Sequence, residues 1–289
     1  MQQYIEFKKQ RELGEILSDT FGFMRNQFKP FFGSILKIVG PYILVMLISL
    51  GFYYYFMGDM FSFAVETSND FFSPIMMLLV GFIFFFSIIA AYVMAQAAVL
   101  FYIESYANNK GVINFDEIRK NVYANFWNFI GLGLLVGISL VVGFIFCFIP
   151  GIYLYPILAL SFSVMVFNKK AVSEAYGYSF TLIKDNWWIT FATFLIIGII
   201  VGVASYAFSI PTYIYMFVKM GTLAGEMDPV AASSGLFDPI YILLNVFSVA
   251  MQFLLNIITL VAGVFIYFNL NEKKNFTGTY ERIENLGKS

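Results

Sequence analysis

The chain has 289 residues, of which 60% are hydrophobic and only 12% are charged. A soluble domain carries about 25% charged residues, so this composition excludes an ordinary soluble protein. The net charge of −1 gives no reason to expect a nucleic-acid partner.

Long segments without any charged residue dominate the chain. They cover residues 38–58, 71–103, 121–168, 186–218 and 239–271. A helix needs about 20 apolar residues to cross the hydrocarbon core of a bilayer. The third segment is long enough for two crossings, and Pro150-Gly151 marks a turn between them. We therefore expect an all-α integral membrane protein with six transmembrane helices, at about 38–57, 74–103, 126–149, 151–168, 187–209 and 240–268.

Basic residues are distributed unequally between the two sides of these spans. Of the 17 Lys and Arg residues, 15 lie in the amino-terminal segment, in the loops 104–125 and 168–186, and in the tail. Lys37 lies just inside the first span, and only Lys219 lies in an opposite loop. Since cytoplasmic loops are enriched in Lys and Arg, we expect both termini in the cytoplasm and localisation to a bacterial cytoplasmic (inner) membrane.

A charged segment with a helical repeat of apolar residues precedes each outward-going span. In the first segment these residues are Leu13, Leu17, Phe21, Met24 and Phe28. In the second, Asn114 is the predicted N-cap, with Glu117 three positions later. Such segments are typical of amphipathic interfacial helices on the cytoplasmic side, and an irregular loop is the alternative.

The three segments can be aligned on Phe28, Phe126 and Trp187. The aligned residues are Met24, Val122 and Ile183 four positions earlier and Gln27, Asn125 and Asn186 one position earlier. This predicts a single membrane domain, 1–289, built from three parallel repeats of an interfacial helix and a helical hairpin. The units are 1–105, 106–168 and 169–270, and 271–289 is a cytoplasmic tail. Chance matches in so hydrophobic a chain are the alternative.

The third segment, 171–188, is a candidate interfacial docking helix. Its apolar face continues into the fifth span, and a lysine lies beside it. The candidate docking residues are Tyr176, Phe180, Ile183, Lys184 and Trp187.

Residues able to support catalysis are scarce. The chain has no histidine and one cysteine, Cys147, which excludes imidazole-based triads and His- or Cys-ligated metal centres. We expect no catalytic residue, no metal and no cofactor. Glu104 is the carboxylate nearest to a span, and it lies either at headgroup level or at lipid depth, where it would be a functional candidate.

Small residues and polar side chains interrupt the apolar spans in two patterns. Glycines in "GLGLLVG" (131–137) and "GIIVG" (198–202) are typical of close helix packing. In the last span every strongly polar residue falls on one stripe, spaced three or four positions apart. The stripe consists of Asn245, Ser248, Gln252, Asn256 and Thr259. It either joins helices by hydrogen bonds or lines a polar pathway or ligand groove.

Residues 148–188 contain "FIPGIYLYPILALSFSVMVF" followed, after six residues, by "EAYGYSFTLIKDNWW". This stretch resembles a membrane-domain family that is found fused to bacterial glycerophosphodiester phosphodiesterases and in stand-alone multi-pass proteins. The matching residues are Pro150, Gly151, Ala175, Ser179, Leu182, Lys184 and Trp187. The phosphodiesterase domain is absent here, so the resemblance implies a membrane module without the enzyme and brings no site residues.

Two functions remain open on these observations. The first is a non-enzymatic accessory or scaffold subunit of a membrane complex, because amphipathic helices offer a docking surface for protein partners. The second is a transporter or lipid-handling protein that uses the polar stripe of the last span. Membrane lipids are expected partners in either case, and nucleic acid is not.

Overall fold

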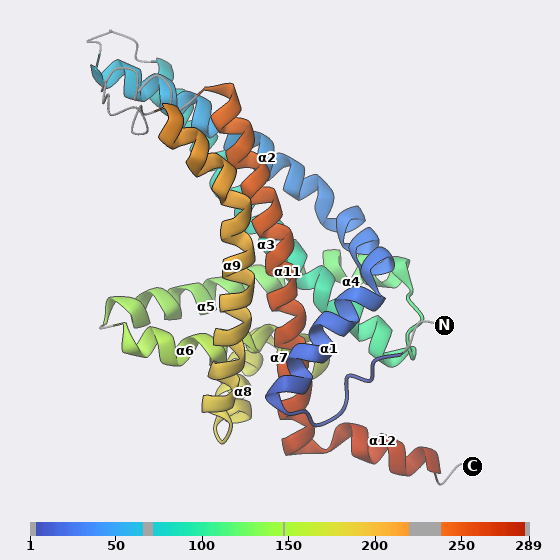
Figure 1. Cartoon of the computed structure of the whole chain (residues 1–289). Helices are drawn as coiled ribbons and strands as arrows, with labels where there is room; N and C mark the ends of the chain where they lie inside the picture. Colours follow the sequence, from blue (N-terminus) through green and yellow to red (C-terminus); the bar gives the residue numbers. More distant parts are fainter. Residues whose placement is uncertain (1–3, 66–71, 147, 220–237, 287–289) are drawn as a thin grey trace. The chain divides into compact units, whose positions relative to one another are not determined.

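The computed structural model describes residues 4–65, 72–146, 148–219 and 238–286, and these residues form helices and no strand. Figure 1 shows the helices in chain order. They are α1 (Leu13–Asn26), α2 (Phe28–Val65), α3 (Phe72–Asn108), α4 (Phe115–Ala124), α5 (Phe126–Ile145), α6 (Ile149–Ala159), α7 (Ser161–Phe167), α8 (Val172–Ile183), α9 (Trp187–Lys219), α11 (Pro239–Asn275) and α12 (Thr277–Leu286).

Six helical stretches among the described residues are long and apolar enough to cross a membrane. They are Phe28–Met57, Pro74–Asn108, Phe126–Ile145, Ile149–Phe167, Trp187–Lys219 and Pro239–Asn275. This confirms the predicted all-α chain with six apolar helices able to span a bilayer. The fourth stretch is broken at Leu160, so it consists of α6 and α7.

All three alignment anchors begin a helix, and the first of these helices begins well before the span expected from about residue 38. Phe28, Phe126 and Trp187 are the first residues of α2, α5 and α9, and a short helix precedes each of them. The three-unit repeat itself stays a prediction.

Four of the helices are longer than a bilayer requires. Helices α2, α3, α9 and α11 contain 38, 37, 33 and 37 residues. At about 1.5 Å per residue, each helix is about 50 Å long or longer, whereas a hydrocarbon core is about 30 Å thick. The helices therefore continue well beyond the spans expected from sequence.

The chain divides into two compact units, each built from several segments. Unit 1 contains residues 1–38, 93–200 and 257–289, and unit 2 contains residues 39–92 and 201–256. All Lys and Arg residues except Lys219 belong to unit 1. The unequal distribution of charge along the sequence thus coincides with the division into units.

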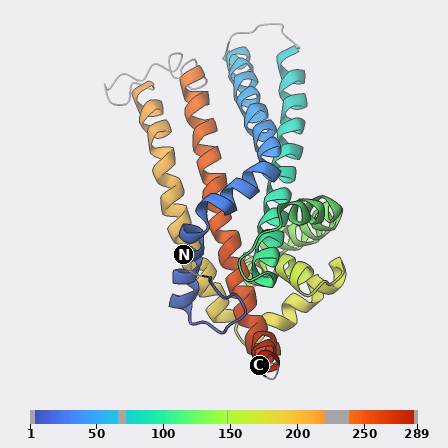
Figure 2. The same cartoon turned by 90° about the vertical axis from the view of Figure 1, so that its right-hand side faces the viewer.

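Unit 2 is a bundle made from parts of the four long helices, which run alongside one another in Figure 1 and Figure 2. The hydroxyl oxygens of Ser49 in α2 and Ser87 in α3 lie 3.1 Å apart. The ring centroids of Tyr92 in α3 and Phe253 in α11 lie 5.0 Å apart. Apolar side chains such as Leu44 and Phe82 are exposed on the outside, where they are suited to contact with lipid.

The core of unit 1 surrounds the last turns of α11. Residues 261–272 of this helix are buried on every side. The ring of Phe265 stacks on that of Phe7 with centroids 4.4 Å apart, and Phe268 lies 4.7 Å from the ring of Phe167 in α7. A helix that is apolar and enclosed all round is central to its domain.

A buried arginine fixes the amino-terminal segment to this helix. The side chain of Arg11 is fully buried, and its Nε donates a hydrogen bond to Asp19 Oδ2 at 2.8 Å. Its guanidinium carbon lies 4.8 Å from the centroid of the Phe265 ring, and its backbone N–H donates to Asn269 Oδ1 at 2.8 Å. Burial lowers the pKa of Arg11, and the hydrogen bond to Asp19 opposes this shift. The buried charge is therefore paired and hydrogen-bonded, as burial requires.

The two ends of the described chain also meet in unit 1. Lys8 Nζ lies 2.5 Å from Glu281 Oε1 in α12, and a Cβ on Gly278 would overlap the backbone oxygen of Lys8. Glu272, which is buried, accepts hydrogen bonds from the backbone N–H groups of Gly278 at 2.7 Å and Thr279 at 2.9 Å. Of the predicted tail 271–289, residues 271–275 are therefore the end of α11, and residues 277–286 form α12, which is attached to the core.

Helices α5 and α6 form a hairpin without any charged residue. A Cβ on Gly143 would lie 3.0 Å from backbone atoms of Gly151, so these two glycines permit the close approach. The glycines of 131–137 and 198–202 have nothing within 4 Å of a Cβ built on them, so the close helix packing expected there is not found among the described residues. In both views the hairpin runs crosswise to residues 187–200 of α9, which belong to the same unit.

We predict that Arg11→Leu strongly destabilises the protein, because it leaves Asp19 without its buried partner. Removing one partner of a buried ion pair costs about 3 kcal/mol or more, and we expect a midpoint of thermal unfolding lower by roughly 5–10 °C. Tryptophan fluorescence of the purified protein measures this midpoint. The control Arg25→Leu changes an exposed arginine of α1 and should leave the midpoint nearly unchanged; equal effects of the two variants would contradict the assigned role of Arg11.

Candidate functional site

The polar stripe of the last span lies on α11, and its central residues are engaged with α9. Gln252 Nε2 donates hydrogen bonds to Ser209 Oγ and to Ser248 Oγ, each at 3.0 Å. The hydroxyl oxygens of Ser209 and Ser248 lie 2.9 Å apart. Asn245 Nδ2 donates to the backbone oxygen of Tyr241 at 3.0 Å. This arrangement favours the interpretation of the stripe as a set of hydrogen bonds between helices.

The remaining two residues of the stripe lie one and two turns further along α11. Asn256 and Thr259 are both half-buried. The stripe as a polar pathway stays a prediction.

The candidate docking helix is α8, and it packs against helices of its own unit. Tyr176 and Phe180 are half-buried, and the Tyr176 hydroxyl lies 2.9 Å from Ser139 Oγ in α5. Ile183 is buried, Lys184 is exposed, and Trp187 donates from Nε1 to the backbone oxygen of Tyr153 in α6 at 3.0 Å. Much of the face expected to be free for docking is therefore occupied by the α5–α6 hairpin.

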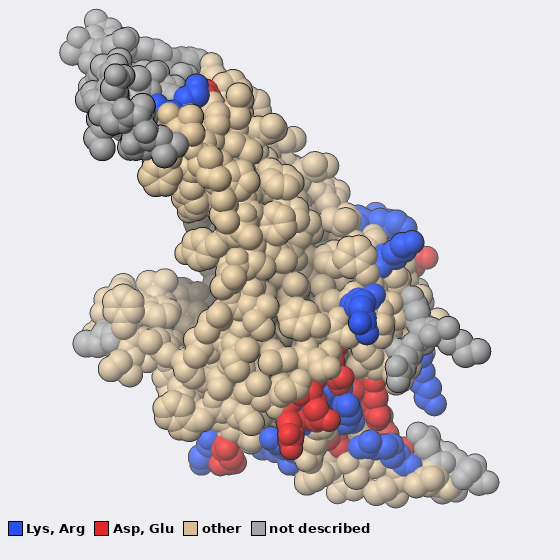
Figure 3. Space-filling view, in the orientation of Figure 1, with Lys and Arg blue, Asp and Glu red and all other residues tan. Residues whose placement is uncertain are grey.

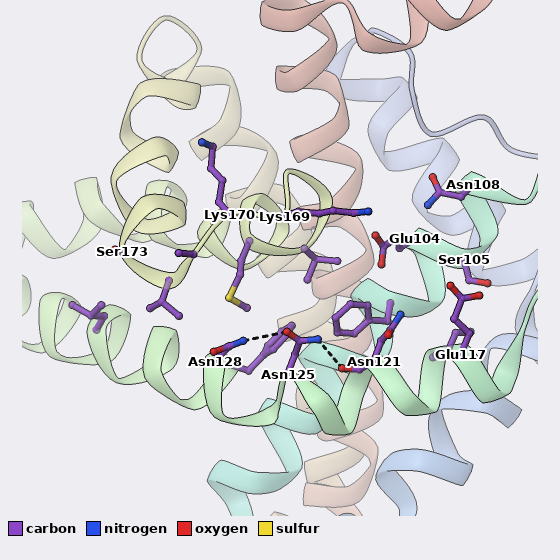
Figure 4. A pocket seen from close by; sticks show the side chains of 18 of the residues that line it. Glu104, Ser105, Asn108, Glu117, Asn121, Asn125, Asn128, Lys169, Lys170 and Ser173 are labelled. Atoms are coloured by element: carbon purple, nitrogen blue, oxygen red, sulfur yellow. Dashed lines mark hydrogen bonds between the residues drawn. The ribbon is translucent and has the colours of Figure 1, made fainter.

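A cavity of considerable size is found elsewhere in unit 1. It is open, has a volume of about 980 Å³, and lies between the end of α3, the helices α4 and α5, and the α7–α8 turn. Figure 4 shows its polar side chains. The polar lining residues are Glu104, Ser105, Asn108, Asn109, Glu117, Asn121, Asn125, Asn128, Lys169, Lys170 and Ser173. This volume lies within the range of small-molecule binding sites.

The wall formed by α3 and α4 is held by hydrogen bonds at the loop between these helices. The backbone N–H of Asn114 donates to the buried Ser105 Oγ at 3.3 Å, and Asn114 Oδ1 accepts from the backbone N–H of Glu117 at 3.2 Å. This confirms Asn114 as the N-cap of α4. Glu104, one turn before the end of α3, is half-buried and lines the cavity. It therefore points into a hollow of the protein.

Three asparagines form a hydrogen-bonded row where α4 meets α5. Asn125 Nδ2 donates to the backbone oxygen of Asn121 at 3.0 Å, and Asn128 Nδ2 donates to Asn125 Oδ1 at 3.2 Å (Figure 4). Asn125 is both the C-cap residue of α4 and the N-cap residue of α5. The break between the two helices therefore turns amide groups toward the cavity.

The α7–α8 turn supplies the basic side chains. Lys169 has a φ of 51°, in the left-handed region that favours glycine. A residue other than glycine there costs about 1 kcal/mol. Lys170 Nζ lies 5.0 Å from the centroid of the Tyr178 ring, whereas Figure 4 shows Lys169 directed toward Glu104. An unfavourable backbone position thus holds a lysine whose side chain lines the cavity.

The chemistry available in the cavity suits binding. Amide groups, hydroxyls, two carboxylates and two ammonium groups offer donors, acceptors and both signs of charge. The cavity is also lined by apolar side chains, which are Phe101, Ile118, Phe129, Leu135, Met165, Val166 and Val172. A ligand with a polar group and an apolar part would find partners for both.

Sequence reasoning missed this cavity because its residues come from separate segments. The asparagines lie at helix ends, where polar residues are common and carry no periodic signal. A possible signal was the density of asparagine between positions 108 and 128, next to the half-buried Glu104. Only folding brings these residues to the α7–α8 turn.

Comparison with protein families, with curated proteins and with solved structures finds no match to this chain. The resemblance to the phosphodiesterase-associated membrane domain therefore rests on the residues of 149–188 alone.

We predict that Gln252→Leu destabilises the protein modestly, because it removes the two side-chain hydrogen bonds between Gln252 and the serines. Such bonds contribute about 0.6 kcal/mol on average, with a maximum near 1.7 kcal/mol. The unfolding midpoint should fall by a few degrees, as measured by tryptophan fluorescence. The control Met251→Leu changes the neighbouring half-buried residue without removing a hydrogen bond, and a larger loss in the control would argue against a structural role of the stripe.

Proposed function

We propose that this chain is a non-enzymatic, lipid-handling membrane protein that holds the headgroup of a membrane lipid in the cavity of unit 1. The observation that carries the proposal is the composition of the cavity, whose lining combines polar and charged side chains with apolar ones. The site differs from the one expected from sequence, because the stripe of α11 is engaged with α9.

Apolar residues of α5 give a lipid chain a route out of the cavity. Phe129 and Leu135 of α5 line the cavity, and further along the same helix Ile138 and Ile145 are exposed. Figure 3 shows no charged side chain on the visible surface of the α5–α6 hairpin. A headgroup in the cavity could therefore continue into acyl chains that follow the surface of α5.

The distribution of basic residues supports a site at the cytoplasmic leaflet. Unit 1 carries all Lys and Arg residues except Lys219, and cytoplasmic segments of membrane proteins are enriched in these residues. The proposal accordingly places unit 1 and both termini at the cytoplasmic face of a bacterial inner membrane. The absence of histidine from the sequence supports binding without catalysis.

A second candidate function, an accessory or scaffold subunit, is favoured by α12. Four apolar side chains at intervals of four, three and three residues are exposed on one face of this helix region: Phe276, Tyr280, Ile283 and Leu286. The opposite face is held by the salt bridge between Lys8 and Glu281 and by Gly278 against Lys8. An amphipathic helix with an exposed apolar face fits an apolar groove or helix of a partner protein.

We predict that Asn128→Trp reduces the lipid retained by the purified protein, because the indole would occupy space at the exposed wall of the cavity. A loss of about 1.4 kcal/mol of binding free energy would lower the retained lipid roughly tenfold. Phospholipid co-purified in mild detergent is quantified per protein by mass spectrometry. The control Thr181→Trp places the same ring on an exposed position of α8 outside the cavity, and equal retention by the two variants would count against the site.

For the second function, we predict that Tyr280→Asp combined with Ile283→Asp removes a stoichiometric protein partner. The two carboxylates would be buried without partners in such an interface, which is unfavourable. Affinity purification followed by quantitative mass spectrometry compares this variant with Tyr123→Asp, which changes an exposed aromatic residue of α4. If no partner is lost selectively from the α12 variant, α12 does not form the docking surface.

A further inference from the structure

We propose that the cavity of unit 1 recognises a phosphoethanolamine headgroup, in which a primary ammonium is linked to a phosphate diester. This inference rests on the proposed function and names the chemical class of its ligand. It follows from the placement of charged and hydrogen-bonding groups around the cavity.

Two side chains of opposite charge face the cavity without pairing. Lys169 and Glu104 are close enough to interact electrostatically, and Figure 4 shows them directed toward one another. Among the described residues, neither forms a salt bridge. A ligand that carries both charges would satisfy the ammonium of Lys169 and the carboxylate of Glu104 together.

The phosphate would bind at the α7–α8 turn. Besides Lys169, the first residues of α8, Val172 and Ser173, line the cavity. Ala171 is the N-cap residue and provides no side-chain hydrogen bond, so backbone N–H groups of this first turn lack intrahelical partners. A twelve-residue helix presents partial positive charge at this end, which adds to the charge of Lys169.

The ammonium group would bind on the opposite wall. Glu104 and Glu117 supply negative charge there, and the amides of Asn108, Asn121 and Asn128 supply oxygen acceptors. A primary ammonium donates three hydrogen bonds, whereas a quaternary ammonium donates none and is recognised by aromatic faces. The lining therefore fits an ethanolamine headgroup better than a choline headgroup.

Anionic headgroups without an ammonium fit this wall less well. Such a ligand would place its phosphate near Lys169 but leave the half-buried Glu104 facing another negative group. Like charges at close range in a partly desolvated site repel one another. The two carboxylates thus select for an ammonium group.

The backbone conformation of Lys169 provides a way to test the role of its side chain. Lys110 and Lys169 both have positive φ values, 47° and 51°, but only Lys169 lines the cavity. Glycine would relieve the backbone strain of the positive φ at either position. Lys169→Gly therefore removes the cation from the cavity without harm to the fold, and Lys110→Gly is a matched control outside it.

The experiment measures the lipid bound by the full-length protein reconstituted with equal amounts of phosphatidylethanolamine, phosphatidylglycerol and phosphatidylcholine. Native mass spectrometry compares the wild type with Glu104→Gln and Lys169→Gly, and with the controls Glu174→Gln and Lys110→Gly. We expect the wild type and both controls to prefer phosphatidylethanolamine by about tenfold. Glu104→Gln should bind lipid without this preference, and Lys169→Gly should bind all three lipids about tenfold less.

Soluble glycerophosphoethanolamine, added as a competitor, tests whether the site binds the headgroup alone or requires an intact lipid. Displacement of bound lipid by this competitor shows that the headgroup alone is enough for binding. Retention of the lipid, together with a preference that depends on Glu104, shows that binding also needs the acyl chains. Cavity-dependent lipid binding with no preference for ethanolamine, or a preference that survives Glu104→Gln, would overturn the headgroup assignment alone. Lipid binding that is insensitive to both Asn128→Trp and Lys169→Gly would overturn the proposed function as well.

Discussion

The enclosure of the last turns of α11 is the constraint on which the rest of unit 1 depends. Residues 261–272 are buried on all sides, so the amino-terminal segment, α7 and the first part of α9 must surround them. This run contains Asn269, Asn271 and Glu272, and burial without partners would be costly for each. Asn269 accepts from the backbone of Arg11 and Glu272 accepts from the first turn of α12. The polar groups of the core therefore determine where both ends of the chain attach.

The two units use polar residues in different ways. In unit 2, serines and Gln252 connect helices that are otherwise apolar, and these contacts suit helices without a hydrophobic driving force between them. In unit 1, polar residues gather at helix ends, where backbone groups lack intrahelical partners. The ends of α3, α4 and α7 and the start of α8 border one cavity, which is how unit 1 comes to hold the candidate site.

The site combines a strained backbone with unpaired charge. Lys169 occupies a conformation that favours glycine, and its ammonium shares the cavity with Glu104. Strain that persists in a folded protein is a reason to look for function at that residue. An amphiphile with a zwitterionic headgroup accounts for the lysine, the carboxylate and the apolar lining residues together, whereas a stripe engaged between α9 and α11 needs no ligand.

The sequence alone determined the all-α class, the six apolar helices, the starts of α5 and α9 at Phe126 and Trp187, and the segregation of charge. These features follow from local rules, because a charged residue in hydrocarbon is costly over any stretch of chain. Tertiary structure decided which faces are buried. In the helices before the spans, the buried positions include Thr20, Ala175 and Ser179, which a search for apolar periodicity passes over. Tertiary structure also decided the cavity, because residues from positions 101 to 173 become neighbours only when the helices pack.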